Sequence, residues 1–293
     1  MRLVYTADLH GNLALYRALG DAALRRDADA VIIGGDLCPG TRPFESQPQA
    51  HGEFIRRDLA SLIAGWKRAR PPLRVFAIPG NDDFQTVLPA LGELEQAGLL
   101  ESLHRLVLRL DSCSILGLAF VPPTPFSIKD FERRDTAGPM RQTMQLFRCV
   151  IGTDSGIRYL ESFQAYLEAE PSIEEELARL DGLLGPDPGS VVAVLHSPPV
   201  NTGCDRMVTR QHVGSRAVRQ WIERRQPLLT LHGHIHESPQ MTKMFADRIG
   251  STWVVNSGSD KQHPHLVFID TENVSAMEHS LYGRARLPGS SQP

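Results

Sequence analysis

The chain begins MRLVYTADLHGN over residues 1–12, and this stretch predicts the start of the fold. Leu3–Ala7 is a short apolar run that ends in polar residues, which is typical of a buried strand. From Leu13 to Arg26 the apolar residues recur at helical spacing, and Asn12 is suited to cap that helix. The opening residues therefore predict a strand, a polar turn and a helix.

The same alternation continues along the chain. Further strands are expected at Val31–Ile33, Arg74–Ile78, Val191–Leu195, Leu228–Leu231, Trp253–Val255 and Leu266–Ile269, and helices at Phe54–Arg68, Tyr159–Ala169, Ser172–Leu184 and Ser215–Arg225. Leu106–Leu110 and Ser114–Phe120 are expected to form an antiparallel hairpin with a turn at Asp111-Ser112. This order predicts an α/β fold: a layered domain with a mixed sheet or a sheet sandwich.

Composition narrows the class of protein. The 293 residues are 41% hydrophobic and 22% charged, which excludes a disordered or fibrous chain. The net charge of −3 gives no strong nucleic-acid signal. No apolar run approaches the roughly 18–20 residues of a transmembrane helix, and the N-terminus turns polar too early for a secretory signal. Four cysteines without C-x-x-C spacing disfavour structural disulfides, so we expect a cytoplasmic protein.

We expect a single domain over residues 1–282. Residues 121–190 are rich in Pro, Arg and Asp, without clean periodicity at first, and are interpreted as an insertion or cap. A second independent domain there is disfavoured, because the segment has too few strongly apolar positions for its own core. A Gly/Pro linker, GPDPG, follows the acidic helices, and residues 283–293 are expected to be a flexible tail.

The residues that suggest chemistry follow the predicted strands. They are Asp8 and His10, Gly34-Gly35-Asp36, Gly80-Asn81-Asp82-Asp83, His196, and Gly233-His234-Ile235-His236. Each motif taken alone has a plainer explanation: D-x-H as surface loop residues, Gly-Asp and Asn81 as turn residues, and H-x-H as a packed histidine beside an exposed one. The carboxyl ends of neighbouring strands converge on one edge of an α/β sheet, however, so the set together favours a ligand site.

The ordered set D-x-H, G-D, G-N-x-D, an isolated His and G-H-x-H resembles the calcineurin-like metallophosphoesterase family. The resemblance extends from Met1 to about Asn273. It implies a sandwich of two mixed β-sheets flanked by helices, which agrees with the strand order. It also implies a dinuclear metal-dependent phosphoesterase in which a metal-bridging hydroxide attacks the substrate.

The resemblance implies a ligand role for seven side chains. Asp8, His10, Asp36 and His236 would bind one metal, and Asp36, Asn81, His196 and His234 would bind the second. Imidazole, carboxylate and amide oxygen suit two divalent ions such as Mn²⁺, Fe or Zn²⁺. Asp36, Asn81, Asp82 and His196 are predicted as the catalytic residues.

Asp82 departs from the family pattern, since many members have His after the Asn. An ionised Asp82, with Asp83 beside it, makes the site less attractive to a dianion than to a monoanion. We therefore predict that a small or cyclic phosphodiester is favoured over a phosphomonoester. A protonated Asp82 acting as a general acid, and low activity, remain open alternatives.

Several other residues near the motifs could contact substrate or could have only a structural role. Lys129, Arg133 and Arg134 either bring positive charge to the substrate or belong to a solvated loop. For Asn201, Arg206 and His212, ordinary loop chemistry is slightly favoured over substrate contact. We expect His232 to be packed rather than a ligand, Cys38 and Cys204 to be small buried side chains, and Asn256–Ser259 to form a structural turn.

Two classes of function remain in competition. The first is the metal-dependent phosphoesterase acting on a small-molecule phosphoester, with a nuclease as a narrower variant. The second is a catalytically weak or inactive metal-binding scaffold on the same fold. The sequence does not reveal the oligomeric state.

Overall fold

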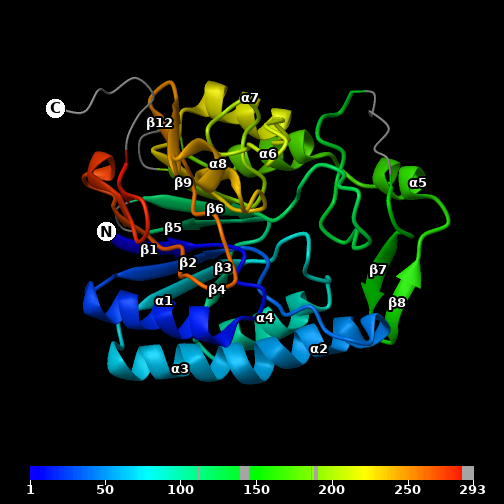
Figure 1. The fold of residues 1–293 in the computed structure, drawn as a ribbon, viewed down its shortest axis with the longest axis horizontal. Helices are drawn as coiled ribbons and strands as arrows, with labels where there is room; N and C mark the ends of the chain where they lie inside the picture. The colour runs from blue at the N-terminus through cyan, green and yellow to red at the C-terminus, as the bar shows by residue number, and fades with distance from the viewer. Residues whose placement is uncertain (111–112, 139–144, 186, 188–190, 286–293) are drawn as a thin grey trace.

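The computed structural model describes residues 1–110, 113–138, 145–185, 187 and 191–285. Two β-sheets face each other, and helices cover the outer side of each sheet (Figure 1). The prediction of two mixed sheets flanked by helices is therefore confirmed. No helix in the described part of the chain has the length and apolar character needed to cross a bilayer.

The first sheet has the strand order β15-β14-β13-β1-β2-β3-β4. Its strands are β1 (Arg2–Thr6), β2 (Ala30–Gly34), β3 (Arg74–Ile78), β4 (Glu101–Ser102), β13 (Val267–Asp270), β14 (Glu278–His279) and β15 (Gly283–Arg284). Strands β1 to β4 run parallel, and β13 is antiparallel to β1. The turns after β1, β2 and β3 therefore lie at the same edge of the sheet.

The second sheet has the order β11-β12-β10-β9-β6-β5. Its strands are β5 (Leu106–Arg109), β6 (Ser114–Leu118), β9 (Val191–Leu195), β10 (Leu229–His232), β11 (Ala246–Ile249) and β12 (Thr252–Asn256). The inner four strands are parallel, and β5 and β11 are antiparallel edge strands.

Successive side chains of β1 point to opposite faces of the first sheet, and this shows how the layers form. Leu3 and Tyr5 pack between the two sheets with Val192 and Val194 of β9, whereas Val4 faces the opposite way. The outer face of the first sheet packs on α1 (Leu13–Arg25), α2 (Gln47–Phe54), α3 (Ala60–Ala69) and α4 (Val87–Gln96). The outer face of the second sheet packs on α6 (Ile173–Asp181) and α7 (Arg216–Arg225), while α5 (Phe163–Glu168) and α8 (Ser238–Thr242) are short.

Several predicted elements are confirmed and others need correction. The Asn12 side chain accepts hydrogen bonds from the backbone amides of Ala14 and Leu15, at 3.1 and 3.3 Å, and so caps α1 as expected. The helix expected at Phe54–Arg68 begins earlier, at the start of α2, and reaches α3 through a π-helical turn, Ile55–Leu59. Helix α4 lies in a segment for which no element was expected.

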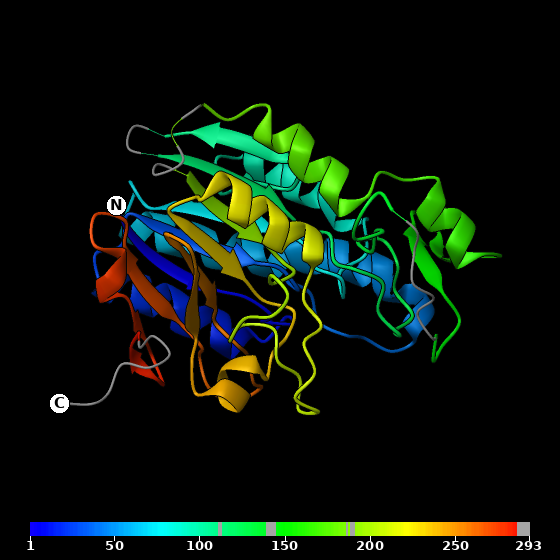
Figure 2. The same cartoon turned by 90° about the horizontal axis from the view of Figure 1, so that it is seen from above.

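The segment 121–190 contains a hairpin that was not predicted, formed by β7 (Val150–Thr153) and β8 (Gly156–Tyr159). The helix expected to begin at Tyr159 is wrong at its start, because Tyr159 ends β8 and α5 begins at Phe163. Figure 2 shows the hairpin and α5 together at one end of the sandwich. That is the end toward which β1 runs (Figure 1).

Three other expectations fall wholly or partly outside the described residues. Gly283–Arg284, expected to start the tail, pair with β14 as β15, and the structure does not describe residues 286–293. The turn at 111–112 and most of the linker at 185–189 also lie outside the described residues. The division into one domain with a cap stays a prediction.

Candidate metal centre

The backbone turns sharply where the strands end. Asp8, His10, Asp36 and His234 all have positive φ angles, of 57°, 43°, 51° and 65°. Side chains other than glycine rarely adopt this left-handed region, and such strain clusters at functional sites. Backbone hydrogen bonds hold the first two loops together, since the amide of His10 donates to the Asp36 carbonyl at 2.9 Å.

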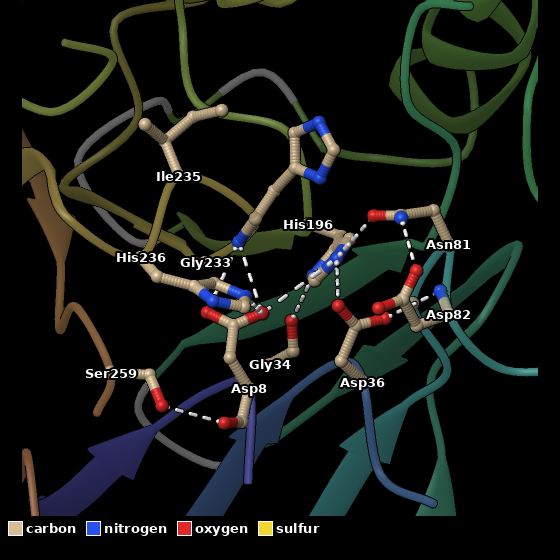
Figure 3. A network of polar contacts seen from close by, with 12 residues as sticks. Asp8, Gly34, Asp36, Asn81, Asp82, His196, Gly233, Ile235, His236 and Ser259 are labelled. Carbon is tan, nitrogen blue, oxygen red and sulfur yellow. Dashed lines mark hydrogen bonds and ion pairs between the residues drawn. The ribbon is translucent and has the colours of Figure 1, made fainter. Parts of the chain in front are cut away.

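Four side chains form the first part of the centre. Asp8, His10, Asp36 and His236 each offer a ligand atom, and these atoms lie within 4.8 Å of one another. The Nε2 atoms of His10 and His236 lie 3.3 Å apart, and His236 Nε2 lies 3.5 Å from Asp8 Oδ1 (Figure 3). Ligands that bind one ion at about 2.0–2.2 Å from it are spaced in this way.

His196 and Asn81 form the second part. The Nδ1 atom of His196 donates to the Gly34 carbonyl at 2.8 Å, which fixes the ring and leaves Nε2 facing the site. Nε2 lies 3.2 Å from Asn81 Oδ1 and 3.5 Å from Asp36 Oδ2. Figure 3 shows His196 reaching this cluster alongside Asp8 and Asp36.

Asp36 lies between the two parts. Its Oδ2 atom is 3.8 Å from His10 Nε2 and 3.5 Å from His196 Nε2. Its other oxygen, Oδ1, accepts a hydrogen bond of 2.8 Å from the amide of Asp82. The Asp36 carboxylate therefore lies next to a candidate ligand atom from each of the two parts.

His234 lies beside the second part. Its backbone amide donates to both carboxylate oxygens of Asp8 at 3.1 Å, and its ring centroid is 5.4 Å from that of His196. Burial lowers the pKa of His234 to about 3, so its imidazole is neutral, as a metal ligand must be. No other residue in the described part of the chain hydrogen-bonds to this ring, which leaves its nitrogens available.

The close approach of the loops requires glycine at position 80. A Cβ atom there would lie 2.2 Å from Asp36 Oδ1 and 2.7 Å from His196 Nε2. Any side chain would therefore displace the two residues that connect the parts. The G-N-x-D motif alone does not reveal this contact.

The buried carboxylates and imidazoles perturb one another strongly. Burial opposes ionisation of Asp36, but the charge of His196 outweighs it and lowers the pKa of Asp36. Burial likewise opposes the charged form of His196 and His236, and attraction by Asp36 and by Asp8, respectively, raises both pKa values to about 9. Each of these carboxylates and its imidazole partner therefore favour the charged form of the other.

Asp82 lies at the open side of the centre. Its carboxylate accepts a hydrogen bond from Asn81 Nδ2 at 2.9 Å and lies 3.9 Å from His10 Nδ1. Burial, followed by the charge of Asp36, raises the pKa of Asp82 to about 6. The side chain is 46% exposed, so water screens part of this effect, and the carboxylate is mainly ionised at pH 7.

Comparison with known proteins agrees with this geometry. The family model for the calcineurin-like phosphoesterase matches residues 1–238. The chain belongs to the calcineurin-like phosphoesterase family. Members of this family use divalent metals, and the donor set described above is of the kind that binds them. The sequence matches no curated protein.

Solved structures share the calcineurin-like fold with this chain. TT1561 of Thermus thermophilus is 16% identical, with a TM-score of 0.61, and the match covers 97% of this chain and 99% of that one. A dimetal phosphatase from Danio rerio is 14% identical, with a TM-score of 0.55 and coverage of 97% and 96%. At these identities the likeness shows the fold alone.

Lys129, Arg133 and Arg134 make their hydrogen bonds and ion pairs inside the segment 121–190 of this calcineurin-like protein, not with the candidate metal ligands. Lys129 is fully buried and pairs with Glu132 at 3.0 Å. Arg133 donates to the carbonyls of Asp130 and Glu132, and Arg134 donates to that of Leu167. Neither expected role, a phosphate contact or a solvated loop, therefore holds for Lys129 and Arg133, because both are buried and engaged in contacts inside the segment.

The loop that contains Asn201, Arg206 and His212 forms a separate cavity of about 500 Å³. His212 Nδ1 lies 2.6 Å from Asp205 Oδ1, and Arg206 Nη1 donates to the Arg210 carbonyl. None of the seven predicted ligands is among the described residues that line this cavity. The amide of Asn201 donates to Asp205 Oδ2 at 3.2 Å, so all three residues take part in contacts within the loop.

Three further expectations agree with the structure. His232 is fully buried, its Nδ1 2.8 Å from the Leu195 carbonyl and its Nε2 2.8 Å from Thr230 Oγ1, so its ring is packed. Cys38 and Cys204 are buried. Asn256 hydrogen-bonds to three backbone carbonyls, which makes it structural.

Two supporting residues were not recognised from the sequence. Asp83, counted there only as a nearby charge, is fully buried and accepts hydrogen bonds from the amides of Leu37, Cys38 and Gly80, each at 2.9 Å. It therefore ties together the loops after β2 and β3. The Ser259 hydroxyl donates to the Asp8 carbonyl at 2.7 Å. Only the spacing of Asp83 within G-N-x-D could have suggested such a role.

Proposed function

We propose that this protein is a dinuclear metal-dependent phosphodiesterase that acts on a small or cyclic substrate. The observation that supports it best is the position of Asp36, whose Oδ2 atom lies within 3.8 Å of an imidazole nitrogen from each part of the centre. A carboxylate shared by two sets of ligands is the arrangement that two adjacent ions require.

In this proposal one ion is held by Asp8, His10, Asp36 and His236. The other is held by Asp36, Asn81, His196 and His234. The donors are nitrogen and oxygen without thiolate, which favours Mn²⁺, Fe or Zn²⁺. When bound, two such ions supply Lewis-acid activation of a phosphoryl oxygen and a lowered pKa for water between them.

The residues around the ions provide positioning and charge. The hydrogen bond from His196 to Gly34 keeps the ring turned toward the substrate side of the centre. Asp82 places a carboxylate 3.9 Å from His10, and Lys129 and Arg133 of the segment 121–190 are engaged elsewhere. A substrate with one negative charge is repelled less than a dianion, which favours a diester over a monoester.

The cellular location is part of the proposal. All four cysteines lie among the described residues and none forms a disulfide. This supports the cytoplasm, where thiols are kept reduced, as the place where the protein works.

The experiment uses metal-stripped protein with Mn²⁺, Fe²⁺, Zn²⁺ or Mg²⁺ added back singly. Hydrolysis of bis(p-nitrophenyl) phosphate and p-nitrophenyl phosphate is measured together with the number of ions bound. We expect metal-dependent cleavage that favours the diester, and two ions per chain. Asp36→Asn should lose the activity and bind fewer ions, whereas Asp21→Asn, at an exposed position on α1, should match the parent.

The outcomes separate the competing functions. Two bound ions without turnover of either ester would favour the scaffold. No metal binding at all would contradict the proposal as a whole. Equal activity of Asp36→Asn and Asp21→Asn would show that hydrolysis does not occur at this centre.

A further inference from the structure

A cavity of about 350 Å³ opens beside the metal centre. His10 and Asp82 form part of its wall, so the cavity and the centre are continuous. The rest of the wall includes Phe44, Phe126, Ile128 and Phe147. Its volume is within the range of about 300–1,000 Å³ that small-molecule sites have.

Two of the aromatic rings are unusually exposed. Phe44 lies against Phe84, with ring centroids 6.0 Å apart, and so belongs to a small buried cluster. Phe126 and Phe147 are 51% and 58% exposed, and neither contacts an aromatic ring in the described part of the chain. Exposed aromatic side chains gathered at the mouth of a polar centre are typical of a ligand site.

The charge of the cavity limits what it can hold. Among its described lining residues there is no Lys or Arg, and Asp82 is the one acidic side chain. Lys129, close by in sequence, is buried against Glu132 at 3.0 Å. A second phosphate or a polyanionic chain would therefore meet repulsion here, whereas an uncharged planar group would meet apolar and aromatic contacts.

We propose that this cavity binds a planar aromatic substituent of the phosphodiester, stacked on Phe126 and Phe147. The inference rests on the proposed function and specifies the substrate class: diesters in which the ester group that stays on phosphorus after cleavage is a nucleoside or an aryl group. Both share the flat, uncharged π-face that such a wall recognises.

The test compares three diesters that share the p-nitrophenolate leaving group: phenyl, ethyl and thymidine-5′ p-nitrophenyl phosphate. We expect kcat/KM for the phenyl and thymidine compounds to exceed that for the ethyl compound by about tenfold, the size of one stacking contact. In Phe126→Ala and Phe147→Ala most of this preference should be lost, so that kcat/KM for the phenyl and thymidine compounds, each divided by that for the ethyl compound in the same variant, falls toward one. Leu183→Ala, at a 52% exposed apolar position outside the cavity wall, should match the parent.

A binding measurement keeps the test independent of turnover. Saturation-transfer NMR with diphenyl phosphate should show transfer to the phenyl protons in the parent and clearly less in Phe126→Ala. Hydrolysis of all three esters with no aromatic preference, and no saturation transfer, would overturn the cavity's role while leaving the proposed function intact. Transfer without any hydrolysis would support the cavity and count against the phosphodiesterase. A preference for thymidine over phenyl would identify the nucleoside as the source.

Discussion

The ring of His196, which follows a strand of the second sheet, is held by the carbonyl of Gly34 in the first sheet, with 2.8 Å between Nδ1 and the oxygen. One nitrogen of the ring thus fixes the direction of the other. Such supporting hydrogen bonds orient ligands and affect their affinity for metal.

Gly35→Ala should weaken metal binding through this contact. A Cβ atom at Gly35, which has a φ of 115°, would lie 2.3 Å from His196 Nδ1, so the ring must move. We expect metal affinity to fall about tenfold or more, measured by competition with a chromophoric chelator. Gly98→Ala is the control, because Gly98 has a φ of 67° and nothing within 4 Å of its Cβ position. Equal losses in both variants would mean that backbone strain alone is responsible.

Asp82→Asn and Asp82→His should shift the ester preference toward monoesters. Removing the negative charge lowers the repulsion of a dianion, and we expect the monoester-to-diester ratio of kcat/KM to rise about tenfold, or about 1.4 kcal/mol. Asp82→His should raise the ratio further, because an imidazolium can also stabilise the dianion. Steady-state kinetics on the two p-nitrophenyl esters measure this. An unchanged ratio in Asp82→Asn would contradict charge selection.

Lys129→Met should destabilise the protein through the buried pair with Glu132. The two side chains are 0% and 1% exposed, so the substitution leaves a buried carboxylate without its counter-charge. We expect the free energy of unfolding to fall by about 3–5 kcal/mol in urea titrations. The double variant Lys129→Met/Glu132→Gln should recover part of that loss. If Lys129→Met were as stable as the double variant, the unpaired Glu132 carboxylate would not be the cause of the loss.

Asp130 should make stability depend on pH. Burial raises the pKa of Asp130 to about 7, while amide hydrogen bonds from Gln85 and Gly152 and the charge of Arg133 offset part of the effect. Because the folded pKa lies above the unfolded one, its contribution is fully present below about pH 4 and is lost as pH rises toward 7.

We therefore expect the free energy of unfolding to fall less steeply in Asp130→Asn than in the parent as pH rises from 4 to 7. The two slopes should differ by at most about 1.4 kcal/mol per pH unit. Urea unfolding at pH 4.5, 5.5 and 7 measures the two slopes. Parallel slopes for parent and variant would show that Asp130 does not titrate in this window.

The sequence predicts the centre better than its surroundings, and the reason is physical. Asp8, Asp36 and His196 follow strands whose apolar runs are visible in the chain. Parallel pairing brings the ends of β1 and β2 together in the first sheet, and the packing of the two sheets brings the end of β9 to them. Their roles as ligands stay predictions. The hairpin β7–β8 was missed because its strands are only four residues each and lack clear alternation. Likewise, a lysine that pairs with Glu132 looks the same in sequence as one that faces substrate.

Long segments of chain separate the residues of the metal centre. Asp8 and the amide it binds at His234 are 226 residues apart, and Gly34 and His196 are 162 apart. Closing such loops costs chain entropy before any contact compensates for it. A fragment with only one of the two sheets would lack at least one ligand of each set, because each set takes residues from both sheets. Metal capture should therefore be among the last events of refolding, so that metal uptake marks the arrival of the complete native topology.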